Sequence, residues 1–135
     1  MPERLFTPEE ANAALEHVRP LVERLVERRA ALLAAQARMA ELLATVAGNG
    51  GGLDPGRARS LVEGVGAAER DLNEVVAELV DAGVVVRDPD AGLIDFPSLR
   101  SGALVFLCWQ LGEDAVEWWH GPDEGFAGRK PLRQD

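Results

Sequence analysis

The sequence predicts an α+β protein in which a long N-terminal antiparallel helical hairpin precedes a small three- or four-stranded antiparallel β-meander. Apolar residues recur at spacings of three and four through residues 15–79, and short β-branched and aromatic segments follow Gly83. The chain has 135 residues, 47% of them hydrophobic, which is the size of one domain with its own core. We therefore take 1–135 as a single domain. Its expected parts are a helical hairpin (1–83), a β-meander (84–120) and an irregular tail (121–135).

The first helix begins at a capping box. Thr7 can cap the helix, Pro8 suits the first helical position, and Glu10 follows the cap by three residues. Pro20 removes one backbone hydrogen bond, so we expect the helix to kink or split near Arg19. Its apolar residues form a heptad-like stripe: Leu15, Val18, Val22, Leu25, Leu32, Met39, Leu43 and Val46.

A glycine-rich connector, residues 48–52, separates the first helix from the second. Asp54-Pro55 starts the second helix, and Gly83 is a typical stop signal just after it. Two apolar stripes joined by a short connector predict an antiparallel hairpin. The second stripe again has spacings of three and four: Ala58, Leu61, Val65, Ala68, Leu72, Val75 and Leu79.

Four extended segments follow the helices. They are 84–87, 93–96, 104–109 and 116–120, separated by turns rich in Gly, Asp and Pro. We expect Pro97 to stop the second of them. In 104–109 both alternating sets of side chains are apolar, so both faces of the sheet should be covered. The hairpin would cover one face, and a second copy of the chain would cover the other.

Charge and cysteine content exclude several classes of protein. The chain has 23 acidic and 14 basic side chains, a net charge of -9, which argues against nucleic acid or an anionic membrane as partner. No uninterrupted apolar run approaches the about 18 residues that cross a bilayer, and no signal peptide precedes the first helix. We therefore expect a cytoplasmic protein. The single cysteine, Cys108, excludes a disulfide framework and a cysteine-rich zinc module, and we expect it to be buried and inert.

Several motifs resemble a known bacterial family. They are ERLFTPEEAN at 3–12, GLIDFP at 92–97, LCWQLGE at 107–113, WH at 119–120 and GFAGR at 125–129. Together they resemble the family called domain of unknown function 2203, and the likeness covers nearly the whole chain. That family has no established activity, so the resemblance implies no catalytic residues. Some members carry names borrowed from a coiled-coil cell-division protein, which reflects helical periodicity.

Residues 88–129 concentrate the side chains suited to chemistry. Arg129 and His120 could clamp an anionic ligand against Trp119. The full set of candidate ligand-binding residues is Asp95, Glu113, Trp119, His120 and Arg129. No motif predicts a cofactor. A divalent metal is the one cofactor for which this segment offers ligands, and the candidates are Asp95, Glu113, His120 and Asp123.

These residues also have structural interpretations. The acidic side chains next to Gly or Pro are typical turn formers. A buried Asp95–Arg129 pair could instead fix the tail over the sheet. Whether Cys108 and His120 share a face depends on the register of the last two strands, which the sequence leaves open.

Two functions remain open from the sequence. The first is a non-enzymatic, self-associating interaction or scaffold module, most simply a homodimer, that acts through the helical stripe and the aromatic sheet face. The alternative is a small-molecule or metal-binding protein, or an enzyme, with its site in the acidic and aromatic C-terminal segment. The alternative requires Asp95, Glu113, His120 and Arg129 to converge around a concavity.

Overall fold

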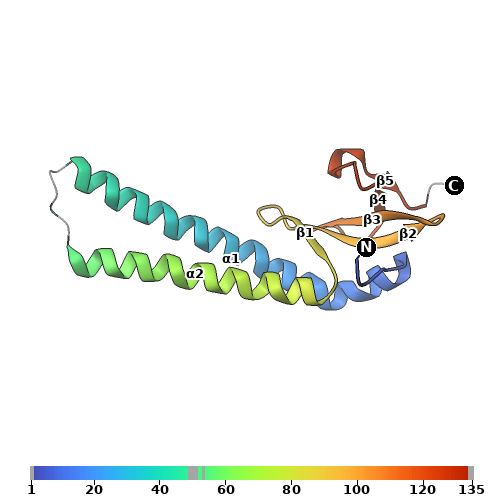
Figure 1. The fold of residues 1–135 in the computed structure, drawn as a ribbon, viewed down its shortest axis with the longest axis horizontal. Coiled ribbons are helices and arrows are strands. Elements are labelled where there is room, and N and C mark those ends of the chain that lie inside the picture. The colour runs from blue at the N-terminus through green and yellow to red at the C-terminus, as the bar shows by residue number, and fades with distance from the viewer. Residues whose placement is uncertain (1, 49–51, 53, 134–135) are drawn as a thin grey trace.

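The computed structural model describes residues 2–48, 52 and 54–133, which form a helical hairpin followed by a five-stranded antiparallel sheet. Figure 1 shows the hairpin projecting from one end of the molecule, with the sheet lying over the first turns of α1. The strands follow one another in the order β1-β2-β3-β4-β5, which is a meander. The expected α+β class is confirmed, with more strands than the three or four expected.

Helix α1 spans Pro8–Gly48 and starts at the predicted capping box. The backbone N–H of Thr7 donates to Glu10 Oε1 at 2.9 Å, and the N–H of Glu10 donates to Thr7 Oγ1 at 3.1 Å. Pro20 does not split the helix, although its ribbon changes direction in the first turns (Figure 1). Val18 and Leu21, on either side of the proline, are buried in the same core, and this packing holds the helix together.

Helix α2 spans Pro55–Asp81 and runs back along α1. Asp54 caps it by accepting a hydrogen bond from the backbone N–H of Gly56 at 3.0 Å. Gly83, at a φ of +88°, ends the helical region in the left-handed conformation that glycine favours. Most of the connector expected at 48–52 lies outside the described residues.

The far half of the hairpin is poorly buried. Leu43, which the heptad spacing placed in the apolar stripe, is 59% exposed. An 18-residue window of α1 has a mean hydropathy of 1.3, yet only 11% of it is buried. By length and composition alone this helix could cross a membrane. From the sequence we expected no membrane-spanning segment, because we considered only uninterrupted apolar runs.

The sheet departs from the predicted strand bounds mainly at Pro97. This residue lies inside β2, although we expected it to end the strand. Its carbonyl accepts from the backbone N–H of Phe6 at 2.7 Å, so this side of the residue faces away from β3. Strand β1 pairs with β2 only as far as Asp95, so on that side the rest of β2 is a sheet edge. Pro97 lies in this part of β2, and its lack of a backbone N–H therefore removes no hydrogen bond between strands. The five strands are β1 (Val85–Asp88), β2 (Leu93–Arg100), β3 (Ala103–Gln110), β4 (Trp118–His120) and β5 (Lys130–Pro131).

The C-terminal tail is more regular than expected. It contains a single 3₁₀ turn, η1 (Phe126–Gly128), and the short strand β5, which pairs with β4. The tail lies over the sheet on the side opposite α1 (Figure 1). We call this side of the sheet the tail face; it carries Asp95, Phe106, Cys108 and His120.

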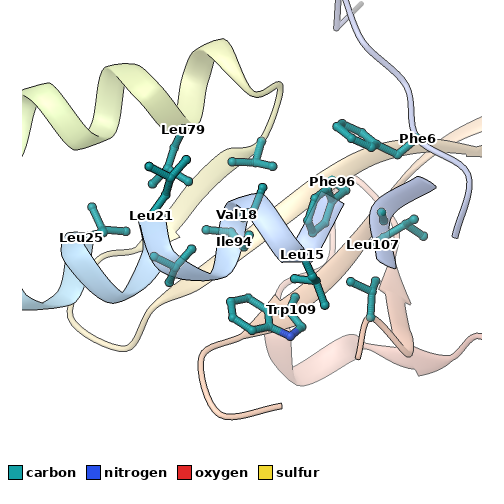
Figure 2. Close-up of a cluster of buried hydrophobic side chains, with 14 of the residues drawn as sticks. Phe6, Leu15, Val18, Leu21, Leu25, Leu79, Ile94, Phe96, Leu107 and Trp109 are labelled. Atoms are coloured by element: carbon teal, nitrogen blue, oxygen red, sulfur yellow. The ribbon is translucent and has the colours of Figure 1, made fainter. Parts of the chain in front are cut away.

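The hydrophobic core lies between α1 and the other face of the sheet (Figure 2). Trp109 is completely buried there, and its indole N–H donates to the carbonyl of Glu113 at 3.1 Å. Both faces of β3 are covered, as its composition predicted. On the tail face, however, Phe106 and Cys108 are buried within a single chain. The expected second copy is therefore not needed to cover this face.

Candidate functional site

Three side chains with metal-binding chemistry meet on the tail face. Asp95 on β2 is paired with Cys108 on β3, and His120 on β4 is paired with Phe106, two residues before Cys108. One ligand atom from each of Asp95, Cys108 and His120 lies within 4.8 Å of the other two, and all three residues are buried. Of the two registers the sequence left open, the structure has the one that places Cys108 and His120 on the same face.

Asp95 lies at the centre of this cluster and contacts both Arg87 and His120. Its Oδ2 accepts a hydrogen bond from Arg87 Nε at 2.7 Å and lies 2.9 Å from His120 Nε2. Its Oδ1 is buried and has no hydrogen-bond partner among the described residues. An unpaired buried acceptor costs roughly 1–3 kcal/mol, so this oxygen marks a position suited to a ligand.

Both ring nitrogens of His120 are engaged. Nδ1 lies 2.8 Å from the carbonyl oxygen of Gly121, which can only accept, so Nδ1 carries a hydrogen and donates it. Nε2 faces a carboxylate oxygen of Asp95, so a proton is held between these two atoms. Neither nitrogen is left to act as a base toward Cys108.

The Cys108 thiol is in the wrong electrostatic state for a nucleophile. Burial, followed by the negative charge of Asp95, raises its pKa to about 11, although a hydrogen bond from Arg129 acts in the opposite direction. Nucleophilic cysteines have a lowered pKa and an adjacent base. The arrangement gives no support to cysteine-based covalent catalysis.

Arg129 and Glu113 form a second pair beside the cluster. Arg129 Nη2 lies 2.9 Å from Glu113 Oε2, and the guanidinium stacks over the rings of Trp118 and Phe126 at 4.6 and 4.2 Å. The structure therefore does not contain the Asp95–Arg129 pair that the sequence left open as one interpretation. Arg87 takes that place because β1 changes register between Val86 and Asp88.

The other two sequence candidates lie apart from the cluster. Trp119 is paired with Leu107, whose side chain belongs to the core face, and its ring lies under Arg100 and Lys130. It is therefore not the platform for a ligand held by His120 and Arg129. Asp123 is exposed and is not one of the three clustered ligands.

Sequence reasoning thus found Asp95 and His120, but it missed Arg87 and gave Cys108 too little weight as a ligand. The available signal was the alternation along β3, which puts Cys108 on the same face as Phe106. The missing knowledge was the register between β3 and β4.

A small cavity adjoins the cluster. Its volume is about 170 Å³, and its lining includes Asp95, Cys108, His120, Arg87 and Glu124. A larger hollow of about 820 Å³ lies between the start of α1 and the β4–β5 side of the sheet. None of the candidates named from the sequence lines that hollow, whereas Asp95 and His120 line the smaller cavity.

The comparisons with known proteins identify the family and nothing finer. The family model described as "Uncharacterized conserved protein (DUF2203)" matches residues 4–132, and the chain belongs to this family. This confirms the resemblance seen in the sequence motifs. No curated protein matches the chain, and no solved structure matches it.

Proposed function

We propose that this member of the DUF2203 family is a cytoplasmic, non-enzymatic module that self-associates through the far half of its helical hairpin. One observation carries the proposal: the apolar 18-residue window of α1 is only 11% buried in the single chain. Apolar surface of this extent on a soluble chain is typical of an interaction site.

The exposed side chains of this half are organised as a stripe. Between residues 30 and 47 the only charged residues are Arg38 and Glu41. Arg38 lies on the side of the helix away from the exposed apolar residues, whereas Glu41, four residues after Ala37 and three before Ala44, borders them. We call this set the outer stripe: Leu33, Ala37, Ala40, Leu43, Ala44 and Ala47.

A second copy of the chain fits this stripe. In a two-fold symmetric contact the same surface meets itself, and an uncharged stripe does so without like-charge repulsion. Its alanines allow the backbones of two helices to approach closely, and four helices from two hairpins form a common bundle arrangement. Residues 30–47 carry one basic and one acidic side chain, so the acidic excess of the chain lies outside this contact.

A bilayer is the competing occupant, and α2 argues against it. Because α2 runs beside α1, inserting the far half of the hairpin would also carry the α2 charges into lipid, at several kcal/mol for each buried charge. These charges include Arg57, Arg59, Glu63, Glu69 and Arg70.

The test is the oligomeric state of the full chain, measured by native mass spectrometry and sedimentation velocity over a range of concentrations. We expect a dimer whose dissociation constant rises at least tenfold in Leu43→Glu. Val80→Glu is the matched control, because Val80 is 61% exposed, as Leu43 is 59% exposed, but lies near the end of α2.

The proposal would be overturned if the wild-type protein were monomeric at about 100 µM. The free energy of dimerisation would then be weaker than roughly 5.5 kcal/mol. Equal weakening by both variants would also overturn it, because the interface would then not be the outer stripe. Co-sedimentation with neutral phosphatidylcholine vesicles, abolished by Leu43→Glu, would assign the stripe to a membrane instead.

A further inference from the structure

We infer that Asp95, Cys108 and His120 form a binding site for a divalent transition-metal ion of the zinc class. The cluster belongs to the tail face of the sheet and is independent of the hairpin proposed above as the association surface. Three features support this site: the donor set, the unpaired oxygen of Asp95, and the fixed orientation of His120.

The donor set selects the kind of ion. A thiolate sulfur, an imidazole nitrogen and a carboxylate oxygen together are typical of Zn²⁺, whereas Ca²⁺ and Mg²⁺ prefer oxygen ligands alone. One donor atom from each of the three residues, which for Asp95 is one of its two carboxylate oxygens, lies within 4.8 Å of the other two. Ligand atoms on a tetrahedral zinc ion are roughly 3.3–3.7 Å apart, so side-chain shifts of about 1 Å would complete the site.

Asp95 offers the ion an oxygen that nothing else occupies. Oδ2 is held by Arg87 at 2.7 Å, which fixes the plane of the carboxylate and leaves Oδ1 as the ligand atom. Asp95 is 1% exposed, so Oδ1 has no access to bulk water as a substitute partner. A bound ion would satisfy the one buried side-chain polar atom that is unpaired among the described residues.

His120 is oriented as metal-binding histidines are. Its Nδ1–H donates to the backbone carbonyl of Gly121 at 2.8 Å, which selects Nε2 as the ligand atom. In the metal-free protein Nε2 shares a proton with Asp95 Oδ2. This proton would be released when the ion binds, because Nε2 must be unprotonated to bind a metal.

The surrounding charges are compatible with a cation. Arg129 is paired with Glu113, and Glu124 is paired with Lys130, so both pairs are locally neutral. The Cys108 thiol would release its proton to solvent when the ion binds. Asp95 and the resulting thiolate then supply two negative charges against the single positive charge of Arg87. Three protein ligands leave a fourth position for water or a small ligand, as in open zinc sites, and the 170 Å³ cavity adjoins the cluster.

The test uses the full chain, stripped with a chelator and titrated with Co²⁺, which reports its ligands by absorption. We expect one Co²⁺ per chain, a thiolate-to-cobalt charge-transfer band in the near ultraviolet, and displacement of the cobalt by Zn²⁺. Cys108→Ser should abolish the band, and His120→Gln should weaken binding at least tenfold. His17→Gln is the matched control, because His17 is the other histidine of the chain and is exposed on α1.

Two results would overturn the site. The first is a folded wild-type protein that shows no charge-transfer band at saturating Co²⁺; this readout needs no variant and so does not depend on whether a variant folds. The second is cobalt binding that persists unchanged in Cys108→Ser and His120→Gln, which would place the ion on surface carboxylates. Circular dichroism of each variant separates lost binding from lost folding.

Discussion

Replacing Trp109 with alanine should remove a large part of the stability of this fold. The side chain is completely buried between α1 and β3, and its indole N–H donates to the carbonyl of Glu113 (Figure 2). Burying an aromatic side chain removes about 150–250 Å² from water, worth roughly 4–6 kcal/mol at about 25 cal/mol per Å². Alanine retains part of this burial and a cavity remains, so we expect a loss of about 3–5 kcal/mol.

Urea unfolding followed by circular dichroism measures this loss, provided the slope with denaturant stays constant. Protein concentration must be fixed, because self-association would make the apparent stability depend on it. Trp118→Ala is the control, since Trp118 is half-buried on the tail face, and it should lose less free energy of unfolding. A loss below about 1 kcal/mol for Trp109→Ala would show that Trp109 is not buried in the core.

Three further predictions test the junctions between elements. Gly92→Ala should destabilise the fold strongly, because Gly92 has a φ of +71° and an added Cβ would meet Leu111 Cβ at 2.8 Å. Gly102→Ala is its control. Gly102 has a similar φ of +80° but open space around it, so this variant should show the backbone strain alone. Asn12→Ala should cost about 1–3 kcal/mol, measured by thermal unfolding, because its amide bonds both the N–H and the carbonyl of Val116. Hydrogen bonds from Thr7 hold the pKa of Glu10 below its ordinary value of 4.5. Glu10 therefore contributes stability above this pH that is lost as pH falls through the folded-state pKa, and Glu10→Gln should flatten that loss in acid titrations of stability.

The hairpin could be predicted because its signals are local. The capping box at Thr7, the three-four spacing and the stop at Gly83 each act within a few residues of chain. Pro97 misled the prediction for a non-local reason. A proline ends a central strand but is accepted at an edge, and only the short reach of β1 makes this position an edge.

The candidate site shows the same limit. Asp95 and His120 were identifiable by residue type, but their neighbours depend on strand register. The bulge in β1 brings Arg87 to Asp95, and the β3–β4 register brings Cys108 to His120. A shift of one residue in either pairing would turn these side chains to the other face, and no local pattern fixes that choice.

The two proposals predict different effects for the same two variants, so the dimer and the metal site can be tested independently. The outer stripe and the metal cluster lie far apart in the molecule (Figure 1). Leu43 follows Leu15, a core residue of α1 beneath the sheet, by 28 residues, which is about 40 Å along the helix. Cys108→Ser should therefore abolish the cobalt band and leave the dimer intact. Leu43→Glu should weaken the dimer and leave the cobalt band intact. If Cys108→Ser also dissociated the dimer while remaining folded, the sheet would have to be part of the interface, and the hairpin alone could not be the association surface.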